Sequence, residues 1–149
     1  MGLFKTENNI NIVATVIRII FGMVFLYSGI IKFIDLDAFA IALGKFKLLS
    51  ESQHYILVYT IPIAEILLGL LLILNIKTHM TSQIITFMVA LFTAVIIAKI
   101  YEGEEISCGC FGNLTEDVID YKTVLRNFIL IMIGISLTSF YYSIRIINK

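Results

Sequence analysis

The chain has 149 residues, of which 59% are hydrophobic and 15% are charged, and its formal net charge is zero. Soluble domains are about half apolar and about a quarter charged, so the excess apolar surface here requires lipid. The balanced charge and the lack of any Lys/Arg-rich run exclude an electrostatic case for nucleic acid as a partner. The length fits one domain, and we expect a single transmembrane domain over residues 1–149.

Four apolar stretches are long enough to cross the ~30 Å hydrocarbon core of a bilayer, which takes about 20 helical residues. The first stretch exceeds the ~7–15 apolar residues of a signal peptide and lacks a small-x-small cleavage site, so we expect a retained helix. The sequence therefore predicts an all-α integral membrane four-helix bundle embedded in the lipid bilayer. The predicted spans are residues 10–33, 55–76, 81–100 and 124–147.

Two of the connections between these spans carry information. Apolar residues at helical spacing predict a short interfacial helix over about residues 36–48, between the first two spans. The connection over residues 101–122 is the most polar part of the chain and holds both cysteines. The distribution of Lys and Arg favours cytoplasmic termini, which would put the interfacial helix and the cysteine loop on the outer face.

Two charged residues fall inside the predicted spans. Arg18 lies in the first span and Glu65 near the middle of the second, where an isolated charge is costly. Because consecutive spans run antiparallel, both residues fall at similar depth, and we predict that they form a buried ion pair. Gly22 and Gly29 share the face of Arg18 and permit close helix approach. The pair either fixes helix register or serves a proton path or polar cavity.

Further polar residues lie near the outer ends of the first and fourth spans. Lys32 and Arg126 either extend to the lipid headgroups or join a polar network inside the bundle. The predicted supporting polar network consists of Arg18, Lys32, Glu65, Arg126 and Asn127.

The sequence Cys108-Gly109-Cys110 has several interpretations. A metal site is disfavoured because two thiolates supply only half the ligands of tetrahedral zinc, and His54 and His79 lie elsewhere. A structural bridge would close almost no loop and so restrain the unfolded chain little. A bridge between cysteines two apart would be strained, and strained, exposed disulfides are labile, which favours redox chemistry. Two idle thiols or an inert bridge remain the alternative.

Four segments resemble the DoxX/MauE family of small four-helix membrane proteins, and together they cover nearly the whole chain. The CGCFG loop, where Gly109, Phe111 and Gly112 set the loop geometry, points to the MauE-like branch. The resembling segments are RIIFGMVFLYSGIIKFID (18–35), PIAEILLGLLL (62–72), CGCFG (108–112) and VLRN (124–127).

The resemblance implies a bacterial cytoplasmic (inner) membrane protein that works with a thioredoxin-fold periplasmic partner during maturation of an exported protein. It makes Cys108 and Cys110 the exchanging pair of a thiol-disulfide oxidoreductase. The layout is also similar to the DsbB and VKOR oxidoreductases, which couple a four-helix bundle to quinone through a second cysteine pair. This chain has only two cysteines and therefore lacks the second pair. Quinone stays a candidate cofactor, and the pair is expected to carry out one step of an electron relay.

Two other classes of function stay open at this point. The chain could be a non-catalytic membrane scaffold that forms a complex with a partner membrane protein or exported protein through its interfacial helix and acidic loop. It could also be a small transporter that uses the Arg18/Glu65 interior, although four helices leave little room for a transport path.

Overall fold

The computed structural model describes residues 3–44, 50–101 and 121–147, and none of these lies in a strand. Four of its helices are long and apolar enough to cross a membrane. This confirms the predicted all-α fold, with a short helix between the first two spans. Residues 45–48 of the predicted interfacial helix lie outside the described residues. The helices are α1 (Leu3–Ile34), α2 (Leu36–Gly44), α3 (Glu51–Ile73), α4 (Thr78–Tyr101) and α5 (Tyr121–Ile147).

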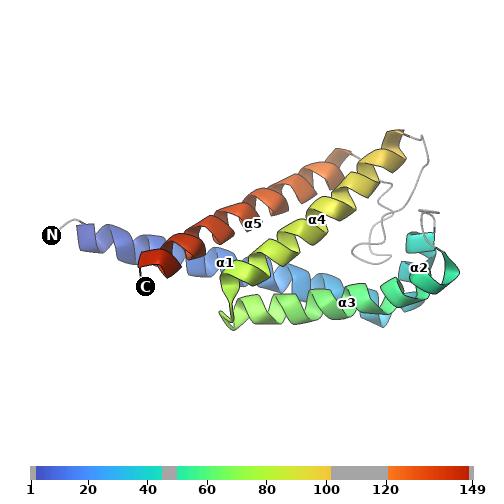
Figure 1. The fold of residues 1–149 in the computed structure, drawn as a ribbon, viewed down its shortest axis with the longest axis horizontal. Coiled ribbons are helices and arrows are strands. Elements are labelled where there is room, and N and C mark those ends of the chain that lie inside the picture. The colour runs from blue at the N-terminus through green and yellow to red at the C-terminus, as the bar shows by residue number, and fades with distance from the viewer. Residues whose placement is uncertain (1–2, 45–49, 102–120, 148–149) are drawn as a thin grey trace.

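The long helices associate as two antiparallel pairs, α1 with α3 and α4 with α5 (Figure 1). A tight turn at residues 74–77 joins the pairs. In this turn Asn75 and Lys77 have φ values of 58° and 45°, the left-handed region that Asn tolerates better than most residues. The hydroxyl of Thr78 donates to Oδ1 of Asn75 at 2.8 Å, which closes the turn against the start of α4.

Glycines bring α1 and α3 into backbone contact, as the shared glycine face predicted. A Cβ atom added at Gly69 would lie 2.7 Å from the carbonyl oxygen of Gly22, and one at Gly22 would lie 2.9 Å from that of Gly69. A Cβ atom at Gly29 would lie 2.8 Å from the carbonyl oxygen of Pro62. Small residues permit this close approach in membranes, where packing rather than water exclusion drives helix association.

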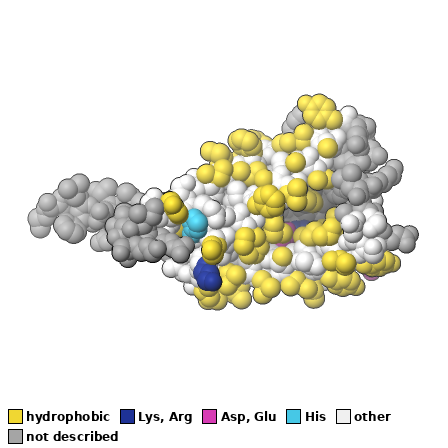
Figure 2. Space-filling view, in the orientation of Figure 1, with side chains coloured by type: hydrophobic (Ala, Val, Ile, Leu, Met, Phe, Trp, Pro, Cys, Tyr) yellow, Lys and Arg dark blue, Asp and Glu magenta, His cyan; other side chains and the backbone are white. Residues whose placement is uncertain are grey.

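Two apolar clusters hold the remaining helices in place. Phe21 and Leu72 from the first pair pack with Ile85 and Leu137 from the second, which joins the two pairs at their centre. A second cluster of Phe39, Leu43 and Val58 fixes α2 against α3. The outward surface is rich in exposed apolar side chains (Figure 2), as a surface that faces lipid requires.

Candidate functional site

A buried ion pair links α1 to α3, but its cation is Lys32 rather than Arg18. Nζ of Lys32 lies 2.6 Å from Oε2 and 2.7 Å from Oε1 of Glu65, and the two side chains are 5% and 12% exposed. Nζ also donates to the hydroxyl of Ser28 at 2.7 Å. The predicted Arg18/Glu65 ion pair is therefore wrong, although Glu65 does carry a buried charge that is paired across the helix interface.

Side-chain direction explains why Glu65 pairs with Lys32 and not with Arg18. Glu65 stands opposite Gly29, because a Cβ atom at Gly29 would lie 3.0 Å from that of Glu65. Helical side chains tilt toward the N-terminus of their helix, so Lys32 reaches back to the level of Gly29. Arg18 lies eleven residues before Gly29, roughly 16 Å along the axis, and it tilts farther away from Glu65.

Arg18 finds its partner at the other end of α3. Its Nη1 atom donates to the carbonyl oxygen of Leu72 at 2.9 Å, and its side chain is only 6% exposed. Leu72 lies in the last turn of α3, where carbonyl groups lack partners farther along the helix and the helix dipole favours a cation. Among the residues that the structure describes, Nε of Arg18 has no hydrogen-bond partner.

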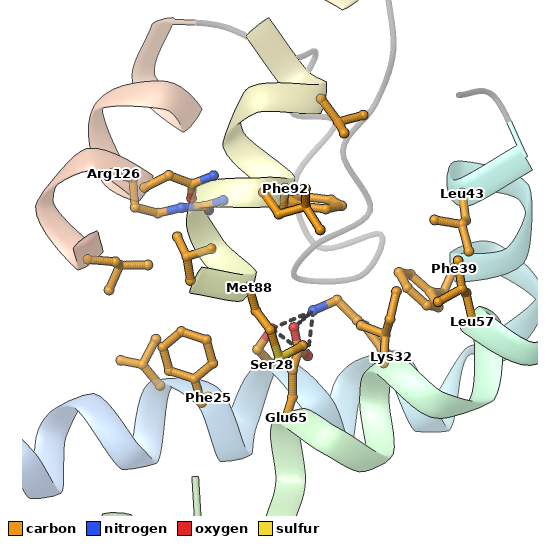
Figure 3. Close-up of a pocket in the computed structure, with 17 residues that line it drawn as sticks. Phe25, Ser28, Lys32, Phe39, Leu43, Leu57, Glu65, Met88, Phe92 and Arg126 are labelled. Atoms are coloured by element: carbon orange, nitrogen blue, oxygen red, sulfur yellow. Dashed lines mark hydrogen bonds and ion pairs between the residues drawn. The ribbon is translucent and has the colours of Figure 1, made fainter. Parts of the chain in front are cut away.

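The Lys32–Glu65 pair forms one wall of a cavity between the two helix pairs (Figure 3). The cavity has a volume of about 410 Å³. Arg126 and Asn127 of α5 line another wall, and Phe39 of α2 also lines the cavity. The ring centroid of Phe39 lies 5.8 Å from Nζ of Lys32, within the range of a cation–π contact. The other walls are almost entirely apolar.

Four of the five residues of the predicted polar network therefore line one cavity, and Arg18 lies outside it. Ser28 and Phe39 were not among the site residues predicted from the sequence. Ser28 could have been found, since it precedes Lys32 by four residues and so lies on the same helix face. Phe39 gave no such signal, because its contact with Lys32 depends on how α2 folds back against α3.

The predicted redox residues, Cys108 and Cys110 with Gly109, Phe111 and Gly112, lie outside the described residues. The chain enters this segment from the end of α4 and leaves it at the start of α5, at the end of the bundle where α2 lies (Figure 1). Within residues 3–44, 50–101 and 121–147, no three His, Cys, Asp or Glu side chains come together as a metal site would require.

Two pairs of apolar helices around a buried ion pair define a multi-pass membrane protein of the helical-bundle class. Residues 10–140 match the family model described as methylamine utilisation protein MauE, and the chain therefore belongs to the MauE family. This confirms the resemblance seen in the sequence. No curated protein and no solved structure matches the chain.

Proposed function

We propose that this protein is the membrane component of a periplasmic thiol-disulfide relay. In this relay Cys108 and Cys110 exchange electrons with a thioredoxin-fold partner during maturation of an exported protein. The observation that carries the proposal is the family match, because residues 10–140 include the only two cysteines of the chain. A multi-pass bundle anchors such a pair at the membrane, where exported proteins emerge.

The exchange proceeds in two balanced steps. A thiolate of the partner attacks the sulfur of Cys108 in the oxidised pair, which forms a mixed disulfide and releases Cys110 as a thiolate. A second partner thiol then attacks the partner's own sulfur, which releases Cys108 and leaves the partner oxidised. Two electrons and two protons pass from the partner to the pair, and the reverse sequence reduces a partner. A second carrier, either another thiol protein or a quinone, must restore the pair.

The proposed orientation places the cysteines in an oxidising compartment. With both termini in the cytoplasm of a bacterial cell, residues 101–122 lie on the outer face of the inner membrane. Disulfides form and persist in the periplasm, whereas cytosolic thiols are kept reduced. Because α2 shares this end of the bundle, it would lie at the same outer interface, where a periplasmic partner can dock.

Mixed-disulfide trapping tests the proposal. In cells that make Cys110→Ser, the thiolate of Cys108 can still attack the disulfide of an oxidised partner and release one partner thiolate. Cys110 is then missing to resolve the mixed disulfide, so a covalent adduct with a thioredoxin-fold protein should accumulate. Cys108→Ser/Cys110→Ser is the matched control and should give none. If neither Cys110→Ser nor Cys108→Ser gives an adduct, the proposal is contradicted.

A non-catalytic accessory subunit is the alternative that the family match also allows. It predicts that the double serine variant, at normal protein level, still supports maturation of the partner. Under the relay proposal, maturation is lost in that variant. Labelling of intact cells with a membrane-impermeant thiol reagent would in addition report the side and redox state of the pair.

A further inference from the structure

We propose that the cavity between the two helix pairs binds an aliphatic carboxylate, with its anionic head toward Arg126 and its tail along the apolar walls. The proposal concerns only described residues and does not depend on the cysteine chemistry. Cavities that bind small molecules typically enclose about 300–1,000 Å³ and combine apolar walls with a few polar groups. The cavity here, of about 410 Å³, has this character.

The apolar part of the cavity suits a flexible hydrocarbon tail. Val24 and Phe25 of α1 and Ile61 of α3 line it from the first pair, and Met88 of α4 and Leu130 of α5 line it from the second. Each long helix thus contributes apolar side chains, so a ligand here touches both helix pairs. A space of this size lined by hydrocarbon inside a bilayer favours an aliphatic chain over water.

The polar groups of the cavity differ in the donors that they can offer. Lys32 donates all three of its N–H groups, two to the Glu65 carboxylate and one to the hydroxyl of Ser28. Arg126 carries five N–H donors in a planar fork, so it can bond a ligand in addition to any protein group. That fork matches the two oxygens of a carboxylate. Asn127, buried beside it, can add an amide donor.

Charge selects an anion over a cation at this place. The described lining contains two cationic side chains, Lys32 and Arg126, and one anionic side chain, Glu65. Because the carboxylate of Glu65 is already bonded to Lys32, it is not available to a cationic ligand head, whereas an anionic head can approach the guanidinium of Arg126 in another wall of the cavity. A cationic head would be repelled there, and a neutral alcohol would gain less from a guanidinium than a carboxylate does.

Ligand displacement on the purified full-length chain in nanodiscs of uncharged lipid tests the proposal. The probe is a dansyl-labelled undecanoate, and the competitors are decanoate, decanol and decylamine. Decanoate should displace the probe, whereas decanol should need at least about tenfold higher concentration, the ratio expected for one charge-assisted hydrogen bond. Displacement by decanol or decylamine at the same concentration as by decanoate would overturn the proposal.

Variants locate the binding. Ile61→Trp fills the cavity and should abolish probe binding, and Val95→Trp does the same from α4 if the first variant fails to fold. The matched control is Val13→Trp, which adds the same bulk at an exposed position on α1 outside this cavity. Arg126→Gln should weaken decanoate about tenfold and leave decanol unchanged. Probe binding that survives in both filled variants would overturn the assignment.

Discussion

Arg18 and Lys32 are two buried cations on the same face of α1, and their surroundings differ. Arg18 donates to a backbone carbonyl at the end of α3, that of Leu72, which belongs to the central apolar cluster. Lys32 is neutralised by a carboxylate at the edge of a cavity. A cation that caps a helix end contributes to register, whereas an ion pair beside a cavity can also meet a ligand. Position along one helix therefore separates a structural charge from a candidate functional one.

Glu65→Ala should lower the free energy of unfolding most. It leaves Lys32 buried without its carboxylate, and loss of one partner of a buried pair typically costs about 3–5 kcal/mol of unfolding free energy. The double variant Lys32→Met/Glu65→Met should recover most of that loss, because no charge then stays unpaired. Reversible unfolding of both variants in detergent micelles would measure the difference, and equal loss in both would contradict this account.

Gly69→Val should disturb both cations together. Its side chain meets the backbone of Gly22 and Leu26, which cannot move without shifting α1 against α3. Overpacking of this kind costs about 1–3 kcal/mol, and the register that aligns Lys32 with Glu65 would change with it. The control is Gly44→Ala, since a Cβ atom there lies 3.5 Å from Nε2 of His54, an ordinary contact. A melting temperature unchanged by Gly69→Val would show that the close approach is not required.

Arg18→Met sharpens the contrast with Glu65→Ala. The substitution removes a charge rather than stranding one, and the carbonyl of Leu72 keeps its bond from the backbone N–H of Asn75. We expect a loss of about 1–2 kcal/mol, near that of one hydrogen bond to a charged group. Unfolding under the same detergent conditions measures it. If Arg18→Met proves as damaging as Glu65→Ala, then Arg18 does more than cap α3.

Ser28→Ala should have the smallest effect. It deletes the bond that Lys32 donates to the hydroxyl and the 3.3 Å bond that the hydroxyl donates to Oε2 of Glu65, and it leaves the ion pair intact. Interhelical and side-chain hydrogen bonds in membrane proteins average about 0.6 kcal/mol, so we expect a loss of that order. A double-mutant cycle with Glu65→Gln would give the coupling of the hydroxyl to the pair. A loss from Ser28→Ala larger than that from Arg18→Met would contradict this ranking.

Much of the fold follows from the sequence because the bilayer imposes strict lengths. Each predicted span overlaps one long helix, and the glycine face of α1 correctly predicted where α1 and α3 touch. The ends of the helices were predicted less well. The second predicted span begins at Tyr55, whereas α3 begins at Glu51, and at this helix start the N–H of Ser50 donates to the side chain of Gln53. Polar residues at its start extend the helix beyond the apolar stretch from which the span was predicted.

The sequence by itself determined that this is a membrane bundle with charges inside it and a cysteine pair outside its spans. Hydrocarbon thickness sets span length, and the rarity of charge in lipid makes Glu65 conspicuous wherever it points. Only the tertiary structure decided that Lys32 is the partner of Glu65 and that Arg126 faces the same cavity. Those facts depend on axial register and side-chain tilt, which arise when helices distant in sequence pack together.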